Sequence, residues 1–477
     1  MTDSVIANDA AAPEGPGGGR RGVLTAAVLG AAGLGVAGVA KALSMGSSTS
    51  DAAATATGTA RSVTTPKATS AAAATPSTAS PSASVSASSA VPSNAVQTAD
   101  RVDINDSYAR TTRRTGATTE HLTYPDIVVT PRRGDIALRG TTTGAMGLDR
   151  GFVVTPALAA LKSSITGGTF AAVPAISTPN LSRSHFQAQD CLERGGASGG
   201  GTTDGWLDRL LQVLGPGTTF RSIGAGYDTP RSLLGQGSPV VMDSLGSFDI
   251  QAIWSADVKK RTMTALKTLY TGFDHPMAST ALTALVAADT VAKVNAAEAT
   301  PAARGYADNE FGNALAALGS LIRTGQGVRV ATVDLGGWDM HTNIGSPLGG
   351  DFTTLASGLG SGLATFLKDL GTAAATTTIV VMTEFGRRVE ANASAGVDHG
   401  HGGVALVLGG GVSGGLKGTW DDNWYSSQDY LDTGDIPGTN DYRDLLAEVV
   451  MKRFGLTAAQ ITPVFPDWTP KPLGVMV

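Results

Sequence analysis

Residues 328–335 read Val-Arg-Val-Ala-Thr-Val-Asp-Leu, and Gly-Gly-Trp-Asp-Met-His follows directly at 336–341. The first stretch is an apolar run of strand length, and the second is a glycine-rich turn that carries an acid and a histidine. A nearly continuous apolar run is typical of a strand that is buried on both faces, as in parallel sheets. The segment therefore predicts an interior strand of an α/β fold with polar side chains at its carboxyl end.

The same pattern recurs along the chain. Apolar runs predict further strands at Thr169–Ile176, Thr378–Thr383 and Val404–Leu408. Apolar residues at helical spacing predict helices between these runs, and Thr155-Pro156 is typical of a helix start. The helices predicted from this spacing span residues 311–322, 352–370 and 445–454. Alternation of strands and helices predicts an α/β domain with a mainly parallel sheet and helices on both faces.

Composition limits the classes of function. The chain has 477 residues and a net charge of -5, from 35 Lys+Arg against 40 Asp+Glu. Proteins that bind nucleic acid usually carry a basic excess, so we expect no nucleic-acid partner. The one cysteine, Cys191, excludes a disulfide within the chain and any cysteine-based zinc or iron–sulfur site.

The first 43 residues have the features of a targeting segment. Arg20-Arg21 precedes an apolar run rich in Ala and Gly, and Ala40-Lys41-Ala42 offers small residues around a cleavage point. This order predicts a twin-arginine signal and the twin-arginine export machinery as a partner. The alternative is an uncleaved membrane anchor, since about 20 apolar residues can span a bilayer. Either way we expect an exported protein that is secreted, periplasmic or held at the cell surface.

Residues 44–119 are predicted to be a disordered spacer. Between residues 51 and 100, Ala, Ser, Thr and Pro account for 39 of 50 positions. Such a segment buries too little apolar surface to offset its loss of chain entropy on folding. We therefore expect one folded α/β domain over residues 120–477, with a mainly helical section at about 205–300.

Polar side chains cluster around the ends of the predicted strands. They lie in Gly336–His341, in Thr383–Arg387, and in residues 398–403 just before the strand at 404. Histidine nitrogens and carboxylate oxygens are ligands that suit divalent metals. The predicted ligands of a zinc, manganese, calcium or magnesium ion are Asp339, His341, Glu384, Asp398, His399 and His401. The simpler alternative is a set of loop hydrogen bonds and a local ion pair between Glu384 and Arg387.

A fourth segment supplies candidates for catalysis. Residues 182–190 follow the strand that ends near residue 176, so His185 can face the same crevice and Ser184 can act as a nucleophile beside it. Arg387 can neutralise the charge of an anionic substrate. The structural alternative is a helix start that is capped by Ser182 or Ser184.

Taken together, these motifs resemble one bacterial family. Ser-Arg-Ser-His-Phe at 182–186, Gly-Trp-Leu at 205–207, Gly-Gly-Trp-Asp-Met-His at 336–341, Thr-Glu-Phe-Gly-Arg at 383–387 and Asp-His-Gly at 398–400 occur in its order and spacing. The family is the exported, sulfatase-like one known as domain of unknown function 1501, and the resemblance covers about residues 125–475.

The resemblance implies an alkaline phosphatase- or sulfatase-like three-layer sandwich. In that superfamily one or two metal ions bind carboxylates and histidines at the strand ends, and phosphate or sulfate esters are hydrolysed. It implies that Asp339 and His341 form one metal-binding pair, that Glu384 is an acidic ligand, and that Asp398 and His399 form the last ligand loop. Two departures stand out: the family's usual first strand with its Gly-Gly-x-Asp-Gly turn is missing, and Cys191 lacks the sulfatase Cys-x-Pro-x-Arg context.

Two functional hypotheses follow. The first is an exported metal-dependent hydrolase that acts on a phosphate or sulfate ester. The second is a non-catalytic secreted or cell-surface protein that keeps the fold and binds an anionic ester or glycan. The missing first strand favours the second hypothesis, and the clustered acids and histidines favour the first. The sequence makes no prediction of the oligomeric state.

Overall fold

The computed structural model describes residues 24–30, 138, 141–149, 152–196, 202–249, 255–419 and 435–477. The chain divides into two units, Met1–Ser44 with Ile104–Val477, and Met45–Asp103. The second unit lies outside the described residues. So do the predicted signal or anchor and the predicted spacer, except for residues 24–30.

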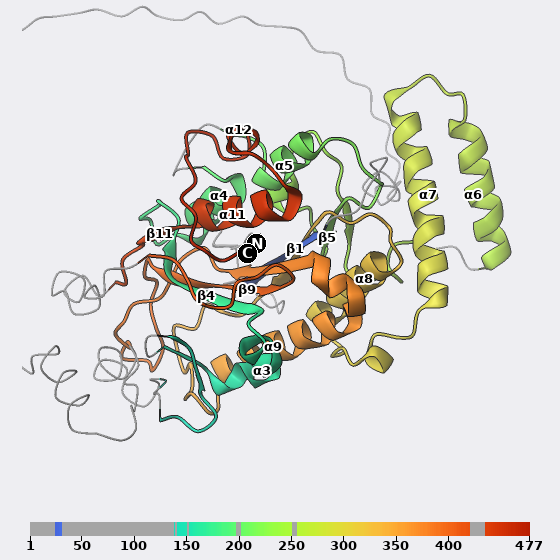
Figure 1. The fold of residues 1–477 in the computed structure, drawn as a ribbon. Coiled ribbons are helices and arrows are strands. Elements are labelled where there is room, and N and C mark those ends of the chain that lie inside the picture. The colour runs from blue at the N-terminus through green and yellow to red at the C-terminus, as the bar shows by residue number, and fades with distance from the viewer. Residues whose placement is uncertain are drawn as a thin grey trace, which may run out of the picture. The chain divides into compact units, whose positions relative to one another are not determined.

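A nine-stranded sheet forms the centre of the first unit (Figure 1). Its strands lie in the order β10-β4-β9-β8-β1-β7-β5-β6, and β11 pairs with β4. A separate hairpin pairs β2 (Met146–Gly147) with β3 (Val153–Val154). The strands of the large sheet are β1 (Leu24–Gly30), β4 (Phe170–Ser177), β5 (Ser222–Ala225), β6 (Val240–Met242), β7 (Val330–Leu335), β8 (Thr377–Met382), β9 (Gly403–Gly409), β10 (Gly415–Leu416) and β11 (Asn440–Asp441).

Most strands of this sheet run in one direction. Strands β10, β11 and β4 are parallel to one another, as are β7, β5 and β6. Strand β9 is antiparallel to β4 and β8, and β1 is antiparallel to β8 and β7. Seven of the nine strands therefore point the same way, and only β9 and β1 oppose them. The predicted α/β class is confirmed.

Helices pack around the sheet. As drawn in Figure 1, α5 and α11 lie above it and α3 and α9 lie below it. The α-helices are α3 (Lys162–Thr166), α4 (His185–Arg194), α5 (Trp206–Leu214), α6 (Ala256–Tyr270), α7 (Pro276–Ala297), α8 (Glu310–Arg323), α9 (Asp351–Leu370), α11 (Tyr442–Phe454) and α12 (Ala458–Ile461). The 3-10 helices are η4 (Pro156–Leu161), η5 (Arg231–Leu233), η6 (Ala302–Arg304) and η7 (Gly371–Thr376).

One helix in the described part of the chain is long and apolar enough to cross a membrane by length and composition. It is the stretch Met277–Ala297 of α7; an 18-residue part of it has a mean hydropathy of 1.3, and 33% of that part is buried. In the structure α7 packs against α6 and α8.

The elements predicted from apolar patterns agree with the structure to within two residues for the four strands, β4, β7, β8 and β9. Thr155 caps η4, because its hydroxyl accepts a hydrogen bond from the Ala157 amide at 3.3 Å. The section at 205–300 contains helices α5, α6 and α7, as predicted, but also strands β5 and β6. These strands have only four and three residues, which is too short for a sequence pattern to identify.

The core follows from the same patterns. All six residues of β8 are buried, as are all eight residues of β4. On α8, Leu315, Leu318 and Leu321 are fully buried against the sheet side of the helix. These residues are spaced by three, so they form one apolar stripe that packs onto β5 and β7.

Strand β1 occupies the centre of the sheet, between β7 and β8. Its register pairs Leu24 with Leu335 and Leu29 with Val330 on one side. On the other side it pairs Thr25 with Met382 and Gly30 with Thr377. Residues 24–30 belong to the segment that the sequence predicts as an export signal or anchor. The same residues cannot be cleaved off and remain β1 in one molecule.

We expect Ala27→Pro to destabilise the full chain by about 3 kcal/mol or more, because proline removes a ladder hydrogen bond and does not fit a central strand. Urea unfolding measures this, with Ala37→Pro, outside β1, as the matched control. If both variants unfold like the parent chain, β1 does not contribute to the stability of the domain.

Glu193 is a buried carboxyl group on α4, with 1% of its surface exposed. Its Oε2 accepts a hydrogen bond from the Ser232 amide at 2.9 Å. Burial raises the pKa of Glu193 well above its ordinary value of 4.5, and the bond from Ser232 only partly opposes this. The folded state therefore holds this proton more tightly than the unfolded chain does.

From this difference we expect a pH dependence of stability. As pH rises above 4.5 towards the folded-state pKa, the free energy of unfolding should fall by up to about 1.4 kcal/mol per pH unit through this group. Glu193→Gln should remove that component, so the parent chain should lose stability relative to the variant as pH rises. Urea unfolding between pH 4.5 and 7.5 tests this, with exposed Glu310→Gln as control. Parallel curves for Glu193→Gln and the parent would contradict it.

Candidate metal centre

The candidate site lies at one edge of the sheet, where several strands end together. Strands β4, β7 and β8 run in the same direction, so their carboxyl ends share this edge. Strand β9 runs the opposite way, so its amino end lies there too. The four connections bring in His185 after β4, Asp339 after β7, Glu384 after β8 and His399 before β9.

Local backbone features let these connections approach one another. Ala175 has a φ of 51°, and the pairing of β4 with β9 shifts register between Pro174 and Ile176. Such a bulge bends the strand near its end. Gly386 has no room for a side chain, because a Cβ there would lie 1.9 Å from the Gly402 carbonyl oxygen. The loops after β8 and before β9 are thus in direct backbone contact.

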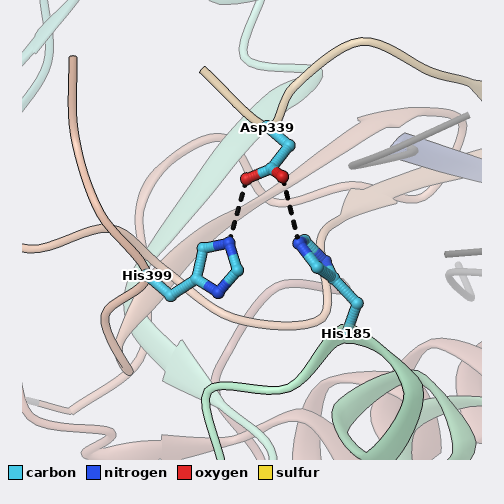
Figure 2. A group of neighbouring side chains, drawn as sticks. All are labelled: His185, Asp339 and His399. Atoms are coloured by element: carbon cyan, nitrogen blue, oxygen red, sulfur yellow. Dashed lines mark hydrogen bonds and ion pairs between the residues drawn. The ribbon is translucent and has the colours of Figure 1, made fainter. Parts of the chain in front are cut away.

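Three histidines surround the carboxylate of Asp339. Oδ1 of Asp339 lies 2.9 Å from Nε2 of His399 and 2.9 Å from Nε2 of His341. Its Oδ2 lies 3.4 Å from Nε2 of His185 (Figure 2). His185, Asp339 and His399 can each offer one ligand atom, and these atoms lie within 4.8 Å of one another. This is a geometry that can hold a metal ion.

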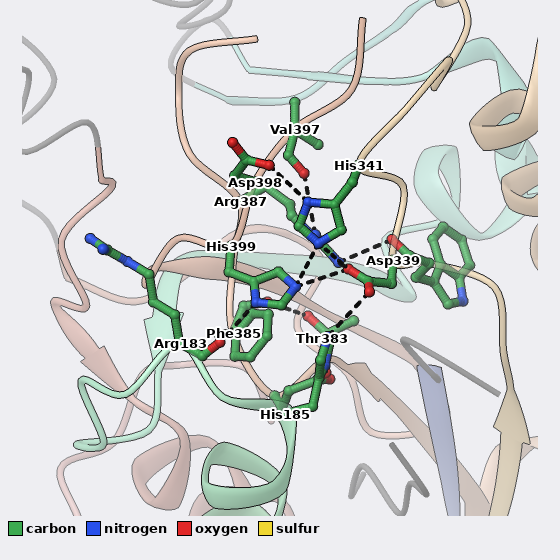
Figure 3. A network of polar contacts seen from close by, with 12 residues as sticks. Arg183, His185, Asp339, His341, Thr383, Phe385, Arg387, Val397, Asp398 and His399 are labelled. Carbon is green, nitrogen blue, oxygen red and sulfur yellow. Dashed lines mark hydrogen bonds and ion pairs between the residues drawn. The ribbon is translucent and has the colours of Figure 1, made fainter. Parts of the chain in front are cut away.

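Each of the three histidines is held through its other ring nitrogen. Nδ1 of His185 contacts Oε1 of Glu384, and Nδ1 of His341 lies 2.8 Å from Oδ1 of Asp398. Nδ1 of His399 donates to the Arg183 carbonyl at 2.8 Å (Figure 3). Metal-binding histidines usually donate their second N–H to such an oxygen, which fixes the ring and its tautomer. The arrangement therefore aims all three Nε2 atoms at Asp339.

The backbone carbonyl of Arg183 determines which ring nitrogen of His399 carries a proton. Because a carbonyl can only accept, Nδ1 of His399 carries a proton, and in the neutral ring Nε2 carries a lone pair. That lone pair would face the Asp339 carboxylate at 2.9 Å and Nε2 of His341 at 3.0 Å. Only a proton or a cation between these atoms makes the contacts favourable.

The pKa shifts reflect the same demand for positive charge. Burial lowers the pKa of His185, but the carboxylates of Asp339 and Glu384 outweigh burial and raise it to about 9. Burial raises the pKa of Asp339, but hydrogen bonds from His185, His399 and Arg387 outweigh it and hold this pKa far below its ordinary value. Hydrogen bonds from His341 and Asn392 lower the pKa of half-buried Asp398.

Arg387 lies beside Asp339. Its guanidinium donates to Oδ1 of Asp339 at 2.8 Å and to the backbone carbonyls of Trp338 at 3.3 Å and Val397 at 3.2 Å. The side chain is 19% exposed, so the cation is only partly shielded from solvent. It compensates the charge of Asp339 and joins the three loops.

Of the predicted ligands, Asp339 and His399 are in the three-residue group, and His341 contacts both of them. Glu384 and Asp398 lie one contact further out, on the far ring nitrogens of His185 and His341. His185, predicted as a catalytic residue, supplies a candidate ligand nitrogen instead. That nitrogen is buried, and its contact in the cluster is Oδ2 of Asp339 at 3.4 Å.

Two predicted site residues lie apart from the cluster. Ser184 precedes α4 as its N-cap, and within the described ranges its hydroxyl makes no hydrogen bond to the cluster or to the helix. His401 lies next to Gly438 and Asp435, where burial lowers its pKa. Neither residue belongs to the group of His185, Asp339 and His399.

The structure adds residues that the sequence pattern did not identify. The Asn392 side-chain amide donates to Oδ1 of Asp398 at 3.0 Å and to the His341 carbonyl at 2.8 Å. The ring of Phe385 packs against His185 and His399, with centroids 4.9 Å and 4.7 Å apart. No short motif marks Asn392, but Phe385 lies inside the motif at 383–387 and its proximity could have been inferred from that.

The cluster joins parts of the sheet on the two sides of β1. Glu384 follows β8, His185 follows β4 and His399 precedes β9, and these strands are consecutive neighbours in the sheet. Asp339 follows β7, which lies on the other side of β1. The position of Asp339 relative to the histidines of the other group therefore depends on the strand between β7 and β8.

Comparison with known proteins gives one match. The family model described as "Protein of unknown function (DUF1501)" matches residues 155–465, which is more than half of the chain. No curated protein and no solved structure matches the chain. The matched range includes each of the residues that surround Asp339 in the structure. The chain belongs to this family, DUF1501.

Proposed function

We propose that the protein is a divalent-metal-dependent hydrolase of phosphate or sulfate esters. The observation that carries the proposal is the convergence of three histidine Nε2 atoms on the Asp339 carboxylate, each ring being fixed by an oxygen on its Nδ1. With the rings neutral and protonated on Nδ1, three Nε2 lone pairs would face one carboxylate, and a divalent cation between them would make these contacts favourable.

The donor set fits a divalent cation. In this proposal His185, Asp339 and His399 hold the ion, and Glu384 orients His185 from outside, as second carboxylates do in known metal sites. Two imidazoles and one carboxylate suit zinc or manganese better than calcium or magnesium, which prefer oxygen ligands. When bound, such an ion polarises the ester oxygens and neutralises part of their charge.

The remaining residues can supply proton transfer and anion binding. His341 is 41% exposed, and its Nδ1 is held by Asp398 at 2.8 Å, so it can donate a proton to a leaving group. Arg387 presents a cation at the same edge, where it can bind a substrate oxygen. Attack by water is the first candidate route, because the Ser184 hydroxyl makes no hydrogen bond to the cluster within the described residues; Ser184, one residue before His185, is the alternative nucleophile.

We also propose that the fold is the three-layer sandwich of the alkaline phosphatase superfamily. The direction of seven strands and the helices drawn on both sides of the sheet support an alkaline phosphatase-like three-layer arrangement. We also propose export by the twin-arginine machinery, which the Arg20-Arg21 pair and the uncharged run after it support.

A non-catalytic role is the second candidate. In the described part of the chain, the strand between β7 and β8 runs antiparallel to both, so its carboxyl end points away from the site. It therefore adds no residue to the site from that end. A protein with this reduced site could bind an anionic ester or glycan without turnover.

We expect metal-free protein to bind one equivalent of Zn²⁺ or Mn²⁺. Asp339→Asn should weaken this binding at least 100-fold because it removes the central anion, and Glu384→Gln should weaken it about 10- to 100-fold through loss of ring orientation. Isothermal titration calorimetry measures both, with exposed Asp257→Asn on α6 as the matched control. Absence of stoichiometric binding by the parent chain would refute the metal centre.

We expect the metal-loaded protein to hydrolyse p-nitrophenyl phosphate or p-nitrophenyl sulfate. His341→Gln should lower turnover about 100-fold and lower metal affinity much less than Asp339→Asn does, because it removes a proton donor that contacts two ligands and is not one itself. His399→Gln should lower both. If Ser184 is the nucleophile, Ser184→Ala should abolish turnover; if water attacks, the variant should keep it. Tight binding of phosphate or sulfate without any turnover would instead support the non-catalytic role.

A further inference from the structure

A large apolar cavity adjoins the metal centre. Its volume is about 520 Å³, within the range of roughly 300–1,000 Å³ found for pockets that bind small molecules. One wall is formed by the sheet through Ala172, Val381 and Leu406, and the opposite wall by α9 through Ala356 and Leu359.

The charged residues that line the cavity lie together at the end next to the metal centre. Glu384 and Arg387 line that end, and they are the residues that contact His185 and Asp339 in the metal centre. Phe385 and Val397, drawn beside the cluster in Figure 3, also line the cavity. A molecule in the cavity would therefore have its polar end next to the cluster and the rest of its length against apolar side chains.

Apolar side chains surround the entrance of the cavity from solvent. Val404 at the start of β9 lines the cavity and is 50% exposed. A half-exposed valine beside an apolar cavity would gain from contact with an apolar ligand that enters there. Trp338, which lines the same cavity, is held by a hydrogen bond from its Nε1 to the Leu335 carbonyl at 2.9 Å.

We propose that this cavity binds the alkyl portion of an amphiphilic substrate whose anionic group lies at Arg387 and the metal centre. The substrate class is then an alkyl phosphate or alkyl sulfate rather than a sugar ester. This inference rests on the proposed hydrolase function for the placement of the anionic group. The apolar lining carries the choice of an apolar chain over a sugar, because polar sugar hydroxyls would lose hydrogen bonds to water there.

The test uses the full, metal-loaded chain and two ligand series measured by calorimetry. Alkylphosphonates with two, four, six and eight carbons resist hydrolysis, and 1-alkanols of the same lengths lack the anion. Affinity should rise about threefold to fourfold per methylene in both series until the cavity is filled. The phosphonate of each length should bind more tightly than the alkanol.

The decisive variant is Ala356→Phe, which fills the cavity from α9. It should abolish the dependence on chain length while leaving the affinity for ethylphosphonate unchanged. Ser361→Phe, on the exposed part of the same helix, is the matched control and should keep the dependence. If Ala356→Phe fails to fold, Val404→Asn at the entrance provides a second variant, which should reduce the gain per methylene.

The two proposals fail in different ways. If affinity does not depend on chain length in either series, the cavity does not bind alkyl chains and the inference is wrong. The same result is expected if another segment of this chain fills the cavity. A chain-length dependence that Ala356→Phe leaves intact also overturns the inference. A dependence in both series with no gain from the phosphonate group, and no turnover of p-nitrophenyl esters, overturns the hydrolase function and with it the placement of the anion.

Discussion

The site depends on one constraint of the sheet, which is that strands β4, β7 and β8 end at the edge where β9 begins. Backbone pairing fixes neighbouring strands about 4.8 Å apart, so loops that leave adjacent strands at the same edge must meet. Side chains from residues as distant as His185 and His399 are thus brought within a few ångströms without any local sequence relationship. Glycines at the loop contacts, such as Gly386, let the backbones touch.

At this edge of the sheet, Asp339 is the anion that the surrounding charged side chains contact. It is only 10% exposed, and it receives contacts from three histidines and Arg387. Without an added cation, such a cluster is favourable only if imidazoles are protonated, and the raised pKa of His185 expresses that preference. A divalent ion would satisfy the same demand with the rings neutral. Competition between protons and metal for the same nitrogens is therefore built into the site.

Much of this could be predicted from the sequence, and the limits have physical causes. Long apolar runs identified β7 and β8, and the acids and histidines after them identified the edge where the site lies. The roles within the cluster could not be assigned, because nothing in the sequence tells which ring nitrogen of His185 faces Glu384. The residues of β1 were assigned to export instead, since a central strand of a sheet and the apolar part of a signal share the same uncharged pattern. No strand was predicted before residue 169, so the centre of the sheet had no predicted occupant.

The occupant of that central position bears directly on chemistry. With β1 in place, β7 and β8 are separated by two strand spacings, about 9.6 Å. If β7 paired directly with β8, Asp339 would shift by about 4.8 Å relative to His185 and His399, which is more than the 2.9 Å contact that joins it to His399. The geometry around Asp339 therefore requires a strand between β7 and β8. Export with cleavage and an assembled metal centre are compatible only if another strand takes the place of residues 24–30.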